Sequence, residues 1–254
     1  IGAVMAAQRV VANQAGDDNY FVYSYGGGGC VVNASAELSG VDFDDNYADQ
    51  GGGLYIDEDG SVELSGAWVQ ENEATDGGGI QVDGGYLSVE NVVLAWNFAA
   101  DDGGSVLSLD GQLVVGNSTI AGDGNSSGSG AEFYLDGNAS LTLENSILYG
   151  TGSASVLYGD GTAYFSGTYN NAYSSSGASV YSGVTDPTGS NGNMSVDPYF
   201  GGVSDDANSS NDDWSLTSTS TCIDAGNPAS SYNDADGTQC DMGAYGGPSS
   251  GWDQ

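Results

Sequence analysis

The residue types in this sequence that could do chemistry are carboxylates, and several of them gather near the C-terminus. Four surround a short loop bounded by cysteines: Asp224, Asp234, Asp236 and Asp241. Carboxylate oxygens carried on loops are the ligands that Ca²⁺ prefers in proteins. The run from Asp234 to Gly237 begins like an EF-hand loop, although no glutamate stands at the closing position. The sequence therefore predicts calcium as the cofactor, bound by these four aspartates.

A second set of aspartates recurs through the middle of the chain, each in a turn that contains glycine: Asp57, Asp83, Asp110, Asp136 and Asp160. If their side chains stack in one column, they repel each other unless cations or water lie between them. Asp-Gly sequences also favour tight turns without any metal, so turn geometry is the competing explanation.

Adjacent aspartates offer the two carboxylates that glycoside hydrolysis needs. The pairs are Asp101-Asp102, Asp205-Asp206 and Asp212-Asp213. We interpret them as turn and solubility residues, and keep glycan hydrolysis as the alternative.

The chain has three cysteines. Cys222 and Cys240 stand within one short stretch of the aspartate-rich tail, and this spacing favours a disulfide that closes a small loop. A disulfide indicates an oxidising, extracellular setting. Free thiols or a metal site are the alternatives to the disulfide, but neither a Cys-x-x-Cys pattern nor a histidine supports zinc. Cys30 is left over and is predicted to be a small buried residue.

The charge balance excludes several classes of protein. The 254 residues include 35 acidic side chains, a single cation (Arg9) and no histidine, which gives a net charge of −34. Catalytic triads need an imidazole, and Schiff-base enzymes and P-loops need a lysine. Nucleic acids and uronate polymers would be repelled, because the chain offers them almost no cations. We therefore expect a non-catalytic protein that does not bind nucleic acid.

Glycine clusters reveal an internal repeat. They stand at 51–53, 77–79 and 103–104, so the repeat has a constant period of about 26 residues. A short apolar segment follows each cluster, beginning at Leu54, Ile80 and Val106. Two further segments with period-two alternation complete each repeat, and helical periodicity is absent.

Three short strands in each repeat predict an all-β fold, the right-handed parallel β-helix (solenoid), with a loop-rich C-terminal cap. One repeat then forms one coil. Successive coils share one apolar column, while acidic side chains face outward. Asparagines at the corners are predicted to form a hydrogen-bonded ladder: Asn46, Asn72 and Asn97. A β-sandwich or propeller is the alternative fold.

The run from Phe43 to Asn46, followed by Gly51-Gly52-Gly53-Leu54, resembles the FxxN and GGAI repeats of polymorphic outer membrane proteins. Looser copies lead to Gly77 and Gly103. The tail from Thr221 to Pro228 is similar to the closing segment of secreted β-helix proteins. The resemblance implies a bacterial, secreted or cell-surface solenoid of the adhesin type.

These observations predict three regions: an N-terminal cap and first coil (1–35), the β-helix coils (36–190) and an aspartate-rich cap with a disulfide (191–254). No apolar run is long enough to cross a bilayer, so no transmembrane segment is expected. The start at Ile1 is interpreted as a processed form that has lost its targeting signal.

We expect a structural or adhesive protein whose partners are copies of itself or cell-surface glycans. The first segment (1–12) is predicted to cap the first coil as a short helix or to supply a strand, and end-to-end stacking would then build a filament. A glycan-binding or glycan-hydrolysing module of the same fold is the alternative. The tyrosines are interpreted as packing or cross-strand pairs, or else as a stacking face for sugars: Tyr55, Tyr86, Tyr134, Tyr158 and Tyr164.

Overall fold

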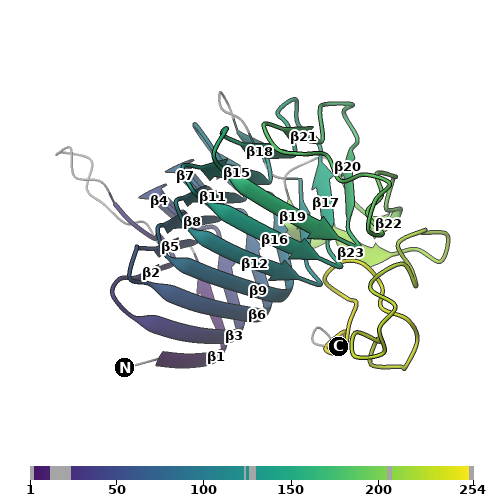
Figure 1. Cartoon of the computed structure of the whole chain (residues 1–254). Helices are drawn as coiled ribbons and strands as arrows, with labels where there is room; N and C mark the ends of the chain where they lie inside the picture. Colours follow the sequence, from purple (N-terminus) through teal and green to yellow (C-terminus); the bar gives the residue numbers. More distant parts are fainter. Residues whose placement is uncertain (1–2, 12–23, 123, 126–129, 205–207, 252–254) are drawn as a thin grey trace.

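The structure is a computed structural model that describes residues 3–11, 24–122, 124–125, 130–204 and 208–251. The chain winds into an elongated coil of short strands, with a loop-rich segment packed beside it (Figure 1). Within the described residues, the regular elements are β-strands and one 3₁₀ turn. None of these residues belongs to a helix with the length and apolar character needed to cross a membrane.

In the part of the chain that the structure describes, three parallel sheets run along the coil. Sheet A has ten strands: β1 (Ala3–Val11), β3 (Ser35–Asp44), β6 (Ser61–Gln70), β9 (Tyr86–Ala95), β12 (Gln112–Gly116), β13 (Thr119–Ala121), β16 (Ser140–Glu144), β17 (Ile147–Gly150), β19 (Tyr164–Thr168) and β20 (Asn171–Ser174). Residues 3–11 therefore supply a strand, which was one of the two predictions for the first segment.

The other two sheets are narrower. Sheet B has four strands: β4 (Tyr47–Gln50), β7 (Glu73–Asp76), β10 (Phe98–Ala99) and β14 (Gly124–Asn125). Sheet C has seven strands: β2 (Gly29–Val31), β5 (Leu54–Ile56), β8 (Ile80–Asp83), β11 (Val106–Leu109), β15 (Phe133–Asp136), β18 (Leu157–Gly159) and β21 (Tyr181–Ser182).

The register of sheet C confirms the predicted repeat. Leu54 pairs with Ile80, and Ile80 pairs with Val106, so equivalent positions of successive repeats lie one above the other. The column continues with Phe133 and Leu157. The all-β prediction of a right-handed parallel β-helix, in which one coil corresponds to one repeat of the sequence, is therefore confirmed.

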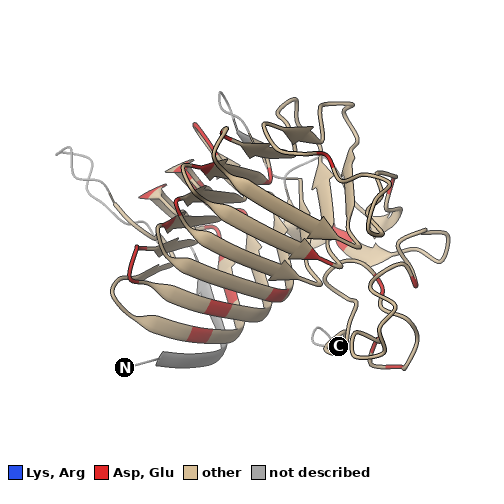
Figure 2. Cartoon of the chain, in the orientation of Figure 1, with Lys and Arg blue, Asp and Glu red and all other residues tan. Residues whose placement is uncertain are grey.

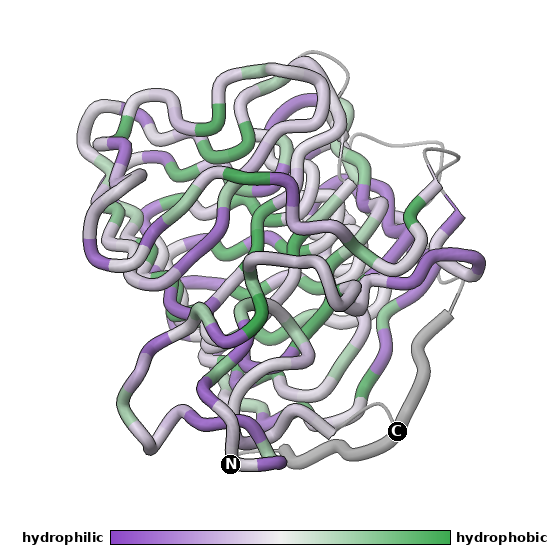
Figure 3. Tube along the Cα trace, turned by 90° about the vertical axis from the view of Figure 1, so that its right-hand side faces the viewer, coloured by the Kyte–Doolittle hydropathy of each residue, from purple (hydrophilic) through white to green (hydrophobic). Residues whose placement is uncertain are grey.

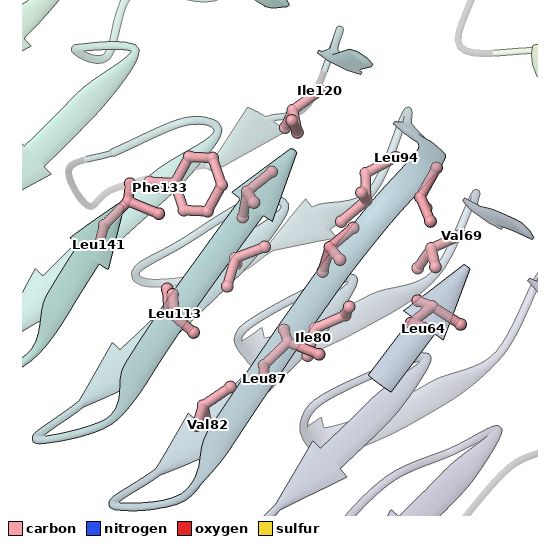
Figure 4. Close-up of a cluster of buried hydrophobic side chains, with 14 of the residues drawn as sticks. Leu64, Val69, Ile80, Val82, Leu87, Leu94, Leu113, Ile120, Phe133 and Leu141 are labelled. Atoms are coloured by element: carbon pink, nitrogen blue, oxygen red, sulfur yellow. The ribbon is translucent and has the colours of Figure 1, made fainter. Parts of the chain in front are cut away.

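The stacked coils enclose one apolar core. Alternate residues of each strand point inward, and side chains such as Ile80, Leu87 and Leu113 are almost completely buried (Figure 4). A single coil could not bury these groups, because its neighbours supply the contacts above and below at about 4.8 Å per strand. Each buried Leu, Ile or Val side chain contributes roughly 1.5–3 kcal/mol relative to exposure. Acidic residues lie in the turns and along the strands (Figure 2), and most of them are exposed or half-buried, whereas Asp44 and Glu132 are buried.

Two strands that were predicted as separate elements are continuous in the early coils. The ten-residue strands β3, β6 and β9 each change direction at one residue in the left-handed region, with φ of 61° at Gly40, 53° at Gly66 and 52° at Asn91. In later coils the same bend separates β12 from β13 at Asn117, and β16 from β17 at Asn145. We call these five residues the bend column.

The glycine clusters are required by close approach between coils. Gly77 has a φ of 62°, which a residue with a Cβ adopts only at a cost. Gly78 lacks a positive φ, but a Cβ there would lie 2.5 Å from the carbonyl oxygen of Gly104 in the next coil. The clusters therefore recur because each one lies directly against the next, in addition to forming a corner.

The loop-rich C-terminal segment lies along the side of the coils (Figure 1). It contains β22 (Phe200–Gly202), a 3₁₀ turn η1 (Ser209–Asn211) and β23 (Asp213–Leu216), and β22 and β23 pair antiparallel. Viewed from that side, the more hydrophobic stretches lie mostly inside the molecule, and hydrophilic stretches recur along the outer loops (Figure 3). The segment adds a second, smaller apolar layer outside sheet A.

Candidate functional site

The bend column holds the C-terminal segment in place. Asn91 Nδ2 donates hydrogen bonds to the carbonyl oxygens of Ala244 (2.9 Å) and Gly246 (2.7 Å). Asn145 Oδ1 accepts from the backbone N–H of Asn227 at 2.8 Å. Both asparagines are almost completely buried, so these contacts fix the segment on the side of the solenoid.

An apolar patch on the outer face of sheet A completes this contact. Val93, Ala95 and Ala121 are fully buried beneath the C-terminal segment, in one cluster with Trp96 and Trp214. The two indole rings lie 6.1 Å apart between centroids. Residues 92–95 of β9 and 120–121 of β13 are apolar on both faces of the sheet, because the core covers one face and the C-terminal segment covers the other, and a period-two pattern alone does not reveal this.

The docked segment forms a wide acidic groove with a volume of about 840 Å³. Its lining includes all four aspartates that were predicted as a cation site, together with Asp213. The structure therefore brings Asp224, Asp234, Asp236 and Asp241 together around one groove, and it adds Asp213, which was not predicted. Asp213 belongs to β23 and joins the groove because the hairpin β22–β23 packs beside the loop.

The carboxylates of the groove are held by the backbone of their own loops. Asp241 Oδ1 accepts from the N–H of Asp224 at 2.7 Å, and the N–H of Asp241 lies 3.2 and 3.1 Å from the two carboxylate oxygens of Asp234. Asp236 Oδ1 accepts from the N–H and hydroxyl of Thr238 at 2.9 and 2.6 Å. The negative charges therefore occupy fixed positions around an open space.

Because their surroundings differ, the aspartates of the groove have different pKa values. Burial, followed by the nearby charges of Asp234, Asp224 and Asp236, raises the pKa of Asp241 to about 6. Burial also raises the pKa of Asp234. The two hydrogen bonds from Thr238 lower the pKa of Asp236. At neutral pH the groove is anionic and suits a cationic group, whereas near pH 6 it begins to lose that charge.

The predicted calcium ligand set is not assembled as one compact site. Among the described residues, no three Asp, Glu or Cys side chains form a group that could hold a metal ion. Ca²⁺ needs six to eight oxygens at about 2.3–2.6 Å, but here loop N–H groups occupy several carboxylate oxygens. The groove is instead wide enough for an organic ligand.

The prediction of a disulfide between Cys222 and Cys240 is wrong, because the structure does not join these two residues. Cys222 and Cys240 are both buried with free thiols. Their environments differ, since Cys222 packs with Ile147 and Met242, whereas Cys240 Sγ lies 3.1 Å from Asn117 Nδ2. The sequence spacing brought the two residues into one segment but did not determine where each side chain points.

Cys30 was predicted to be buried, and it is exposed. It occupies the central position of β2, where side chains of sheet C alternate and this one points outward.

The asparagine ladder is confirmed. Asn72 Oδ1 accepts from the N–H and Nδ2 of Asn46 at 3.1 and 2.8 Å, and Asn97 Oδ1 accepts from the same groups of Asn72 at 3.2 and 2.9 Å. A second ladder, absent from our prediction, links Asn170 to Asn193 at another corner. The later coils vary in length, so no fixed period marked this pair.

The predicted aspartate column is interrupted. Leu109 pairs with both Asp83 and Asp136, so the leucine occupies the position expected for Asp110. Asp110 adopts a φ of 54° and accepts hydrogen bonds from Asn138 instead. A continuous five-carboxylate column is therefore wrong, and turn geometry explains Asp110.

Two tyrosine pairs lie along sheet C. Tyr134 and Tyr158 belong to adjacent strands, and their ring centroids are 4.9 Å apart, which confirms the interpretation as cross-strand pairs. Tyr55 packs against Tyr25 with centroids 4.7 Å apart.

The adjacent aspartate pairs have different surroundings. Asp212 Oδ2 accepts from Trp96 Nε1 at 2.5 Å, whereas Asp213 lines the acidic groove. The pair 205–206 lies outside the described residues.

No protein-family model, curated protein sequence or solved structure matches this chain.

Proposed function

We propose that this chain is a non-catalytic, secreted or cell-surface adhesive protein that binds cationic groups through the acidic groove. The solenoid provides a rigid support, and the C-terminal segment carries the binding surface. The resemblance of residues 43–54 to polymorphic outer membrane protein repeats supports a bacterial surface location. The absence of lysine and histidine from the sequence excludes Schiff-base and imidazole-dependent catalysis by this chain and so supports a non-catalytic role.

The observation that carries the proposal is the convergence of five aspartates on one open groove. The ligand must compensate this charge, because the chain has a net charge of −34 and contains one cation. Hydroxyl groups of Ser215, Thr238 and Ser250 share the lining. Such a surface fits amine groups displayed on a glycan or a polymer, which carboxylates bind as charge-assisted hydrogen-bond acceptors.

The test is binding to particles coated with a polyamine, compared with particles coated with a neutral polymer. A triple variant, Asp224→Asn, Asp234→Asn and Asp236→Asn, should lose most of the amine-dependent binding at physiological salt. The matched control is Asp45→Asn, Asp59→Asn and Asp186→Asn, at exposed positions away from the groove. Because both variants change the net charge equally, an equal loss in both would refute the groove and leave only general electrostatic attraction.

Calcium binding stays a prediction and is tested in the same assay. Ca²⁺ held in the groove would compete with the amine and raise the unfolding temperature of the unmodified protein. The triple groove variant should then lose this stabilisation, whereas the control variant should keep it.

Glycan hydrolysis is a second candidate, favoured by one observation. A glycoside hydrolase uses one carboxyl group with a raised pKa as the acid and an ionised carboxylate as its partner. Asp241 has a raised pKa of about 6, and Asp236, on the same groove, has a lowered one. Release of reducing ends from neutral or amine-bearing glycans, abolished by Asp241→Asn, would support hydrolysis and overturn the non-catalytic proposal.

Self-association also stays a prediction. Among the described strands, β1 is the outermost one of sheet A, and such an edge can pair with a further parallel strand. If copies stack end to end through cations, light scattering should increase with protein concentration and fall after EDTA. Scattering from a monomer across the whole concentration range would contradict end-to-end assembly.

A further inference from the structure

Two tyrosines and two aspartates form a square on the outer face of sheet C. Tyr134 of β15 pairs in register with Tyr158 of the adjacent strand β18 (Figure 1), and their ring centroids lie 4.9 Å apart. Side chains two residues apart in a strand share a face, so Asp136 lies beside Tyr134. Asp160 follows β18 and continues the ladder, since its N–H donates to the carbonyl oxygen of Leu135. We call the two tyrosines and two aspartates the Tyr–Asp square, and all four are half-buried.

The two carboxylates are held by turns, and each keeps one oxygen for a ligand. Asp136 Oδ1 accepts from the N–H of Gly137 at 2.7 Å. Asp160 Oδ1 accepts from the N–H and the hydroxyl of Thr162, both at 3.1 Å. From the part of the chain that the structure describes, no hydrogen bond reaches Oδ2 of either aspartate. The turns therefore fix the positions of two negative charges beside the rings.

Negative charge acts on the rings from both sides. Burial and then the charges of Asp102 and Asp136 raise the pKa of Tyr134 to about 12, and Asp160 acts in the same direction. Adjacent strands are about 4.8 Å apart, so the carboxylates of Asp136 and Asp160 repel one another, and a cation between them removes the repulsion. The only cation in the sequence is Arg9, which belongs to β1 in the first coil, so the cation must come from a partner.

We propose that the Tyr–Asp square binds an arginine side chain of a partner protein, with the guanidinium lying on the two tyrosine rings and its N–H groups directed to the two aspartates. None of the four residues lines the acidic groove, so this inference does not depend on the proposed function. A guanidinium is planar, stacks on aromatic rings and donates paired hydrogen bonds to carboxylates. The square presents both of these features side by side, with the rings in one column of sheet C and the carboxylates in the next.

Other ligands fit the square less well. Ca²⁺ needs six to eight oxygens, whereas the described residues supply no group of three acidic side chains for a metal. A lysine ammonium carries the same charge, but it is compact, strongly hydrated and unable to stack as a plane. A neutral sugar would cover the rings and leave the two carboxylates without a counter-charge.

The same Tyr-x-Asp spacing near the other end of sheet C does not make an equivalent surface. Tyr55 is 7% exposed, and its hydroxyl donates to Asp83 Oδ2 at 3.1 Å. Its ring packs against Tyr25 with centroids 4.7 Å apart. Both the ring and the carboxylate are therefore already occupied there, and Tyr55 serves as an internal reference for the experiments below.

Calorimetric titration of the full chain tests the inference. The probes are two six-residue peptides, in which glycine alternates with arginine or with lysine, and a β-1,4-linked glucose oligomer. They are titrated into the triple groove variant, which removes charge from the groove, and into the unmodified chain in parallel. In the triple variant, we expect the arginine peptide to bind about threefold more tightly than the lysine peptide. Equal affinities would overturn stacking on the rings, and tighter binding of the glucose oligomer would overturn the inference in favour of a sugar-binding face.

The two aspartates are tested by Asp136→Asn combined with Asp160→Asn. An asparagine keeps an oxygen that can accept the turn hydrogen bonds but loses the charge, so affinity for the arginine peptide should fall roughly tenfold while the fold is kept. The matched control is Asp45→Asn combined with Asp59→Asn, two exposed positions in other coils, and its affinity should fall by no more than about twofold. An equal loss in both variants would overturn the inference, because general attraction to an acidic chain would then explain the binding.

The rings are observed directly in the unmodified protein with ¹³C-labelled tyrosine. The ring resonances of Tyr134 and Tyr158 should shift when the arginine peptide is added, while those of Tyr55 should stay in place. Unshifted resonances of Tyr134 and Tyr158 at saturating peptide would place the arginine elsewhere and overturn the inference, whatever the variants show.

Discussion

Replacement of Asn72 by alanine should destabilise the solenoid more than any substitution of an exposed asparagine. The Asn72 side chain is fully buried and takes part in four hydrogen bonds. Its Oδ1 accepts from the N–H and Nδ2 of Asn46, and its Nδ2 donates to the carbonyl oxygen of Phe43 (3.0 Å) and to Asn97 Oδ1 (2.9 Å). Alanine removes all four and leaves their partners in a region that water does not reach.

The magnitude follows from these four bonds. A net contribution of about 1 kcal/mol for each gives a loss of about 4 kcal/mol in the free energy of unfolding. Urea denaturation followed by far-UV circular dichroism measures this loss, with linear extrapolation to water. The variant Asn72→Asp keeps the acceptor but buries a charge and loses both donors, so it should be at least as destabilising at pH 7.

The control is Asn138→Ala. Asn138 is exposed, and its side chain makes one hydrogen bond, from Nδ2 to Asp110 Oδ1 at 2.9 Å. Its loss should cost no more than about 0.5 kcal/mol. If Asn72→Ala costs as little as this control, the ladder does not stabilise the coils, and packing of the apolar column alone must account for their register.

Three further predictions follow from the structure. Because the pKa of Asp241 is raised to about 6 from 3.8, the folded protein binds more protons than the unfolded chain between these two pH values, so its stability should fall as pH rises from 3.8 to 6. Asp241→Asn should flatten this part of a plot of unfolding temperature against pH. An unchanged slope would contradict the raised pKa. A thiol reagent should modify only Cys30 in the folded protein and should reach Cys222 and Cys240 after unfolding. A reductant should leave the unfolding temperature unchanged. If titration of the unfolded chain found two thiols fewer than three, Cys222 and Cys240 would form a disulfide. Gly78→Ala should cost about 2 kcal/mol or more in chemical denaturation, because its Cβ meets backbone of the adjacent coil rather than a movable side chain, whereas a cost near zero would refute the close approach.

The fold was predictable because its determinants are periodic. In a solenoid each coil repeats the same environment, so apolar residues such as Leu54 and Ile80 recur at the separation that the register imposes. The buried asparagines were predictable for the same reason, since Asn46, Asn72 and Asn97 occupy one corner. Agreement between turn residues, strand alternation and repeat length favoured the β-helix over a β-sandwich or propeller.

Predictions based on turns alone were less accurate. Asp110 was assigned to the aspartate column from its Asp-Gly dipeptide, but inward side chains fix the register, and they place Leu109 there. The buried side chains fix the register of each strand, while the turns between strands vary in length. A residue in a turn therefore cannot be aligned between coils by counting from the glycine.

The C-terminal segment illustrates the limit for contacts without a period. Its cysteines and aspartates were recognised as a group, and the structure places the four predicted aspartates around one groove. The direction of each side chain could not be predicted, because it depends on docking against residues far away in the sequence, such as Asn91. The thiols of Cys222 and Cys240 consequently differ from the prediction.

One signal for this docking is nevertheless present in the sequence. The bend column needs a residue that tolerates the left-handed region, and glycine and asparagine both do so. The first two coils have Gly40 and Gly66 at this position, whereas the next three have Asn91, Asn117 and Asn145. Backbone conformation alone would permit glycine in every coil. At the bend itself, Asn91 and Asn145 make buried hydrogen bonds to the C-terminal segment, whereas the segment contacts the coil of Gly66 through Glu71, away from the bend. In this chain, the change from glycine to asparagine along the bend column therefore marks where the C-terminal segment hydrogen-bonds to the bend, and the next coil has Tyr169 at this position, with a φ of 55°.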